Sequence, residues 1–69
     1  MNTKISVKDF SGNYHSIYYF WQMGKVKISV DSTPYCERND MADAERTAKA
    51  IIENKGWNAE TAIVRKVNY

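Results

Sequence analysis

The side chains best suited to covalent chemistry are scarce in this 69-residue chain, which has one cysteine, Cys36, and one histidine, His15. A thiol and an imidazole can act as nucleophile and base, but no motif links these two. They are also too few for a structural zinc site, which takes four ligands. Asp40 and Asp43 suggest a metal at first, yet their position at the N-terminus of a predicted helix explains them as N-cap and dipole partner. We therefore expect no metal and no other cofactor.

Two further features argue against an enzyme. The three glycines, Gly12, Gly24 and Gly56, are isolated from one another, so no glycine-rich phosphate loop is present. A mass of 8.0 kDa leaves little room for a preformed pocket of several hundred Å³. Binding, rather than catalysis, is the activity that we expect.

The most informative segment is YHSIYYFW, residues 14–21, which is rich in aromatic side chains. In a strand its side chains alternate between two faces. Ile17, Tyr19 and Trp21 form the more apolar row, which we predict to lie under a helix. Tyr18 and Phe20 then lie on the open face. Exposed rings beside lysines can stack with the bases of a nucleic acid, and they can also anchor a protein partner. Equally, tyrosines on the solvent-exposed face of a small sheet can simply pair across strands.

The charges are polarised along the chain. The net charge is +3 over residues 1–30, −3 over residues 31–60 and +2 over residues 61–69. Such asymmetry steers charged partners to one side, although lysines on strands also discourage aggregation through sheet edges. We predict that Lys25, Lys27 and one of Arg65 or Lys66 flank the open rings. The candidate binding residues are Tyr14, Tyr18, Phe20, Lys25, Lys27, Arg65 and Lys66.

These residues must be positioned by a small sheet. Residues 4–8 and 25–30 alternate polar and apolar side chains, and residues 14–21 are mostly β-formers, so we predict a meander of three antiparallel strands. Residues 35–38 either resume pairing or remain a loop. Residues 61–67 form the last strand, which is apolar on both sides and is therefore predicted to be central in the sheet.

A helix of about 15 residues is predicted between residues 40 and 55. Asp40 is its N-cap and Gly56 its left-handed C-terminal cap. Its narrow apolar stripe contains Met41, Ala44, Ala48, Ile51 and Ile52. The predicted fold is thus a single compact α+β domain, residues 1–69, with a four-stranded antiparallel sheet (strand-strand-strand-helix-strand) and one helix packed on one face. We predict that Val26, Ile28, Ile51, Ile52 and the apolar row of the aromatic strand are buried together.

The late acid-capped helix, DMADAERTAKAIIENKGW, and the closing basic strand, ETAIVRKVNY, follow a short antiparallel sheet. In this order of elements the chain resembles very small phage-encoded inhibitors, among them certain anti-CRISPR proteins and an inhibitor of host RNA polymerase. The resemblance implies a compact, non-catalytic protein that blocks a large nucleoprotein machine of the host by covering a surface. It carries over no functional residue.

Three classes of function remain open from the sequence. The first is a phage-type inhibitor that sterically blocks a host nucleic-acid-handling complex, and the second is a module that binds nucleic acid directly. The third is a structural or assembly protein, for instance a homodimer through an edge strand. The start MNTKISVKDF lacks the apolar core of a signal peptide, and no apolar run approaches the length of a membrane span. We therefore expect a cytoplasmic protein of the bacterial host cell, monomeric or weakly dimeric, with no membrane partner.

Overall fold

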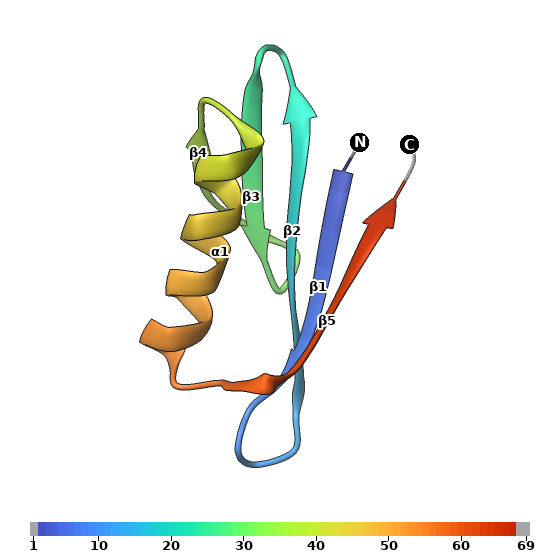
Figure 1. Cartoon of the computed structure of the whole chain (residues 1–69), viewed down its shortest axis with the longest axis vertical. Helices are drawn as coiled ribbons and strands as arrows, with labels where there is room; N and C mark the ends of the chain where they lie inside the picture. The colour runs from blue at the N-terminus through green and yellow to red at the C-terminus, as the bar shows by residue number, and fades with distance from the viewer. Residues whose placement is uncertain (1, 68–69) are drawn as a thin grey trace.

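The computed structural model describes residues 2–67 and shows an α+β fold with an antiparallel sheet and one helix (Figure 1). The sheet has five strands rather than the predicted four, in the order β4-β3-β2-β1-β5. The additional strand includes residues 35–38, which the sequence left undecided. The elements are β1 Asn2–Lys8, β2 Tyr14–Gln22, β3 Lys25–Val30, β4 Thr33–Arg38, α1 Met41–Lys55 and β5 Asn58–Val67.

Two hairpins of this sheet close through two-residue turns. Met23 and Gly24 join β2 to β3 with φ of 53° and 78°, and Asp31 and Ser32 join β3 to β4 with φ of 50° and 67°. Positive φ at both central positions is what a type I′ turn requires, and this turn matches the right-handed twist of the strands it joins. Asp tolerates the left-handed region better than most residues, so a turn without glycine still forms before β4.

The helix forms where the sequence predicts it. The Asp40 side chain accepts a hydrogen bond from the Asp43 N–H at 2.8 Å, and Gly56 adopts φ 71° at the C-terminus. The N–H of Trp57 then donates to the Ile52 carbonyl oxygen at 3.1 Å, which closes the cap. Both caps satisfy backbone groups that a helix end otherwise leaves without partners.

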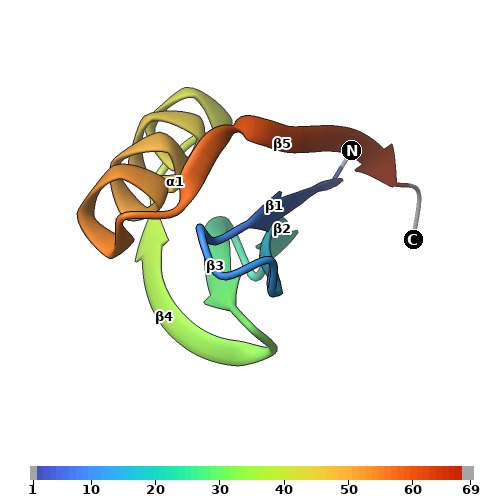
Figure 2. The ribbon, with the colours of Figure 1, turned by 90° about the horizontal axis from the view of Figure 1, so that it is seen from below.

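The core lies between α1 and one face of the sheet (Figure 2). The predicted apolar row is confirmed for Ile17 and Tyr19, whereas Trp21 at the strand end is 46% exposed. Ala44 and Ala48 of α1 are fully buried, and their small side chains allow the helix to approach the sheet closely. The other predicted core residues are confirmed. The buried apolar cluster is Ile5, Val7, Ile17, Tyr19, Val26, Ile28, Val30, Ala44, Ala48, Ile51 and Ile52.

The position of β5 corrects the prediction of a central strand. It pairs with β1 and lies at the edge of the sheet (Figure 1). Apolar side chains on both of its faces therefore stay in contact with water. Ile63 is 54% exposed on one face and Val64 is 57% exposed on the other. Alternation in a sequence shows which faces are apolar but not how many neighbours a strand has.

Candidate functional site

The face of the sheet opposite α1 carries the predicted pair of rings. Tyr18 and Phe20 are neighbours on the same face of β2, and their rings stack with centroids 4.8 Å apart and planes 23° apart. Both side chains are half-buried. Stacking on each other holds the two rings in place while leaving part of their surface open to a partner. We call this side of the sheet the open face.

Basic side chains surround this pair on the neighbouring strands. Lys4 of β1 pairs directly with Tyr18, and Arg65 of β5 pairs with Lys4, so a row of Arg65, Lys4 and Tyr18 crosses three strands. On the other side Lys27 of β3 pairs with Phe20. Residues directly opposite in an antiparallel pair share a face, so these cations lie beside the rings.

The charge on β3 is partly neutralised. Lys27 forms an ion pair with Glu37, and Lys25 donates a hydrogen bond to the Asn39 Oδ1 at 2.7 Å. The hydrogen bond from Lys27 lowers the pKa of Glu37, so this carboxylate stays charged. Within residues 2–67, Lys4 and Arg65 form no ion pair. The uncompensated positive charge of the open face is therefore on the β1–β5 side.

Lys66 does not belong to this face. It pairs with Thr3, which is buried, and its Nζ donates to the Thr3 Oγ1 at 3.3 Å. Consecutive side chains of a strand point to opposite faces, so Arg65 on the open face places Lys66 on the helix side. The candidate set from the sequence is corrected accordingly, and Lys4, which the prediction omitted, takes the place of Lys66.

Tyr14 marks the far end of the open face. The Lys8 Nζ lies 5.0 Å from the centroid of the Tyr14 ring, a cation–π contact between directly paired residues. A depression of about 370 Å³ separates Tyr14 from the basic row. Its walls are Lys4, Ser6, Tyr14, His15, Ser16, Asp31, Ile63 and Arg65. The cations Lys4 and Arg65 thus share this hollow with the carboxylate of Asp31.

His15 has a structural role that the sequence did not reveal. Its Nε2 lies 2.8 Å from the Asp9 Oδ2, its Nδ1 lies 2.9 Å from the Asp31 Oδ2, and its ring stacks on Trp57 with centroids 4.2 Å apart. The hydrogen bonds with Asp9 and then Asp31 raise the pKa of His15. The His15 hydrogen bond likewise lowers the pKa of Asp9. With a carboxylate at each ring nitrogen, His15 fits best as an imidazolium that joins two turns to the end of the helix.

The same contacts separate His15 from the cysteine. Cys36 pairs with Ile28 in the sheet and packs against the buried cluster from β4. The carboxylate of Asp31 also accepts a hydrogen bond from the Ser16 N–H at 3.0 Å. Burial raises the pKa of Asp31, but its hydrogen bonds with His15 and Ser16 together outweigh burial, so the pKa of Asp31 is lowered. The His15 ring nitrogens thus face carboxylates, and the structure does not assemble a thiol–imidazole pair.

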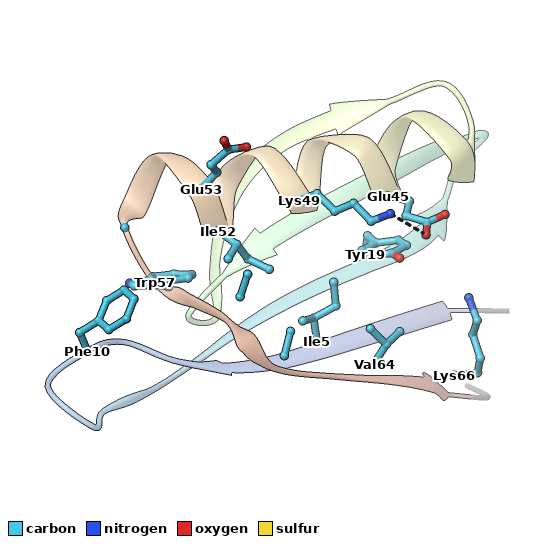
Figure 3. A pocket seen from close by; sticks show the side chains of 13 residues that line it. Ile5, Phe10, Tyr19, Glu45, Lys49, Ile52, Glu53, Trp57, Val64 and Lys66 are labelled. Atoms are coloured by element: carbon cyan, nitrogen blue, oxygen red, sulfur yellow. Dashed lines mark ion pairs between the residues drawn. The ribbon is translucent and has the colours of Figure 1, made fainter.

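A half-open groove on the helix side corrects the expectation that so small a chain has no room for a pocket. It measures about 680 Å³ and runs between α1 and the β1–β5 side of the sheet (Figure 3). Phe10 and Trp57 stand at one end and Lys66 at the other. The inner face of β5 is only partly covered along this groove, where Val64 is 57% exposed. Its floor and walls are mainly apolar, including Ile5, Tyr19, Ile52, Ala62 and Val64.

In comparisons with known proteins, no protein-family model, no curated protein and no solved structure matched the chain. Within residues 2–67, no helix has both the length and the apolar character needed to cross a membrane. Over the same residues, histidine, cysteine and acidic side chains form no group of three that could hold a metal ion.

Proposed function

We propose that this protein is a non-enzymatic binding protein that covers a negatively charged surface of a nucleic-acid-handling complex with its open face. Blocking would be steric, as in the phage-encoded inhibitors that the order of elements resembles. One observation carries the proposal: the stacked Tyr18 and Phe20 lie beside Lys4 and Arg65, two cations that have no carboxylate partner in residues 2–67. Partly exposed rings supply the apolar centre of an interface, and the cations supply charge complementarity.

Truncating one ring tests this proposal. The Phe20→Ala variant should still fold, because its side chain is only half-buried and makes a stacking contact worth about 0.5–1.5 kcal/mol. In a complex, loss of a central ring often costs about 2 kcal/mol or more, which is roughly a thirtyfold loss of affinity. Phe10→Ala is the matched control, since Phe10 is an exposed ring that lines the helix-side groove and not the open face.

The binding measurement is capture of partners from bacterial lysate on immobilised wild type, Phe20→Ala and Phe10→Ala, with and without nuclease. A partner whose capture survives nuclease, is retained by Phe10→Ala and is lost by Phe20→Ala supports the proposed mode. Equal capture by all three proteins would exclude the open face from binding.

The second candidate function is direct binding of single-stranded nucleic acid. It is favoured by the same ring pair, because bases stack on aromatic side chains while cations neutralise phosphates. Anisotropy of labelled single-stranded oligonucleotides should then fall steeply with salt, and Lys4→Glu should flatten that dependence. Capture that nuclease abolishes would favour this candidate over a protein surface.

A further inference from the structure

The cluster around His15 joins segments that are far apart in the chain. His15 is on β2, Asp9 belongs to the turn between β1 and β2, and Asp31 belongs to the turn between β3 and β4. Each ring nitrogen lies within 2.9 Å of one carboxylate oxygen, and the imidazole ring stacks on Trp57 with ring planes 7° apart. Trp57 follows the C-terminal cap of α1 and lines one end of the helix-side groove. Two turns and the end of the helix thus meet at one titratable ring.

Only the protonated form of His15 can satisfy both carboxylates. An imidazolium has two N–H donors, one for each carboxylate, and its charge also favours stacking on an indole. A neutral imidazole has a single N–H, so its second nitrogen presents a lone pair to a carboxylate oxygen. Loss of the proton therefore breaks one hydrogen bond of the cluster and weakens the stack on Trp57.

The surroundings of the two carboxylates indicate which hydrogen bond is lost. The Asp9 side chain is 22% exposed, and its other oxygen accepts the N–H groups of Ser11 and Asn13, both at 2.9 Å. The Asp31 side chain is 48% exposed, so water can replace His15 there with a small desolvation penalty. We therefore expect the neutral ring to keep its proton on Nε2, which faces Asp9, and to release Asp31.

Other charged groups face the cluster from the neighbouring elements. Lys4 of β1 and Arg65 of β5 line the hollow that also has His15 and Asp31 in its walls. Lys55, at the end of α1, attracts the Asp31 carboxylate through its charge. These three cations disfavour an imidazolium and favour a free Asp31 carboxylate, so they act in the same direction as loss of the proton.

We propose that His15 is a proton-controlled latch. In its protonated form it holds the β1–β2 turn, the β3–β4 turn and the ring of Trp57 together. In its neutral form it keeps Asp9, releases Asp31 and loosens Trp57 at the end of the groove. The hydrogen bonds with Asp9 and then Asp31 raise the pKa of His15 above 6.5, so the latch opens as the pH rises through that raised value. It does not involve the stacked rings of the open face and is independent of the proposed function.

Nuclear magnetic resonance of the full chain tests the latch. His15 is the only histidine, so its ring protons report its titration in a protein that carries no histidine tag. The midpoint should lie above pH 6.5, the ordinary value. The side-chain carboxyl carbon of Asp31 and the indole N–H of Trp57 should shift with the same midpoint, and the Asp31 signal should shift more than the Asp9 signal. A midpoint at or below 6.5, a constant Asp31 or Trp57 signal, or a larger shift at Asp9 would each overturn the inference.

Asp31→Asn tests the chemistry of the release. Asparagine tolerates the positive φ of 50° at this position. Its Oδ1 can still accept the Ser16 N–H, and its Nδ2 can donate to the lone pair of a neutral imidazole. The neutral ring then keeps both partners. The midpoint of His15 should therefore fall below that of the wild type, and the pH-dependent shift of Trp57 should become smaller.

His15→Gln is the control, because it removes the titrating group. The Asp31 and Trp57 signals of this variant should no longer move through the pH range in which wild-type His15 titrates. Three outcomes with the variants would contradict the latch. They are an unchanged His15 midpoint in Asp31→Asn, a Trp57 shift as large as that of the wild type in the same variant, and movement of the Trp57 signal that persists in His15→Gln.

Discussion

The burial of Ile51 gives the sharpest test of how α1 is oriented on the sheet. Ile51 is 3% exposed and packs from the helix into the apolar cluster. Replacing isoleucine by alanine removes three carbon groups, worth about 2.4 kcal/mol by transfer at about 0.8 kcal/mol each. The cavity left behind raises the cost, so we expect about 2–5 kcal/mol of destabilisation.

That loss is large for so small a protein. At roughly 0.05–0.15 kcal/mol per residue, the whole chain has a free energy of unfolding of only roughly 3.5–10 kcal/mol. Each kcal/mol moves the melting temperature of a domain of this size by roughly 4–8 °C, so Ile51→Ala should melt about 8–40 °C lower than the wild type. Thermal unfolding followed by circular dichroism, together with urea titration, measures both quantities.

The matched control is the same substitution at an exposed position. Ile63→Ala removes the same atoms from a side chain that is more than half exposed, so its cost should stay below about 1 kcal/mol. Both variants are compared at low protein concentration, so that self-association does not contribute. If Ile51→Ala melted within about 3 °C of the wild type, or if the two variants lost equal stability, the helix would not bury the face described above.

Three further substitutions or conditions test the caps and the histidine. Gly56→Val should destabilise the fold by about 1 kcal/mol or more, because valine resists the positive φ of this position. A Cβ at Gly56 meets no atom within 4 Å, so the backbone conformation is the only cause. Denaturant titration measures this loss against Gly56→Asn, because asparagine tolerates positive φ better. Asp40→Ala should cost about 0.5–2 kcal/mol through the lost N-cap, measured the same way. Because the pKa of His15 is raised in the folded state, protonated His15 stabilises the fold, and this stabilisation is fully present below pH 6.5, its ordinary pKa. The stabilisation is lost as the pH rises through the pKa of His15 in the folded protein. The lowered pKa values of Asp9 and Asp31 stabilise it above 3.8, and this stabilisation is lost as pH falls below that value. Urea unfolding at different pH values should therefore give the greatest stability between pH 3.8 and pH 6.5. If the loss of stability at higher pH persisted unchanged in His15→Gln, another group than His15 would cause that loss.

The helix could be predicted from the sequence because its determinants are local. Asp40 and Gly56 act on backbone groups within one turn of themselves, and the apolar stripe is read from spacing alone. The faces of the strands were also predictable, since alternation placed Tyr19 inward and Tyr18 outward. These features depend only on residues that are neighbours in the chain.

The errors concern what lies beside each strand. Ile63 and Val64 make β5 resemble a central strand, and nothing in their types shows that only β1 pairs with it. Lys66 was included with Arg65 because the face of that strand was not fixed before its pairing with Thr3 was known. His15 gave no signal because its partners belong to two separate turns and come together only in the folded sheet.

The sheet order also has a consequence for the timing of folding during synthesis. β1 pairs with β5, and the Lys8 N–H donates to the Thr61 Oγ1 across 53 positions of the chain. At roughly 5–20 residues per second, a ribosome makes the second neighbour of β1 about 3–11 s after β1 itself. During that interval the hairpins of β1 to β4 can form, but one side of β1 has no strand beside it. The nascent chain thus exposes an apolar edge that a chaperone, or another nascent copy, can reach before β5 does.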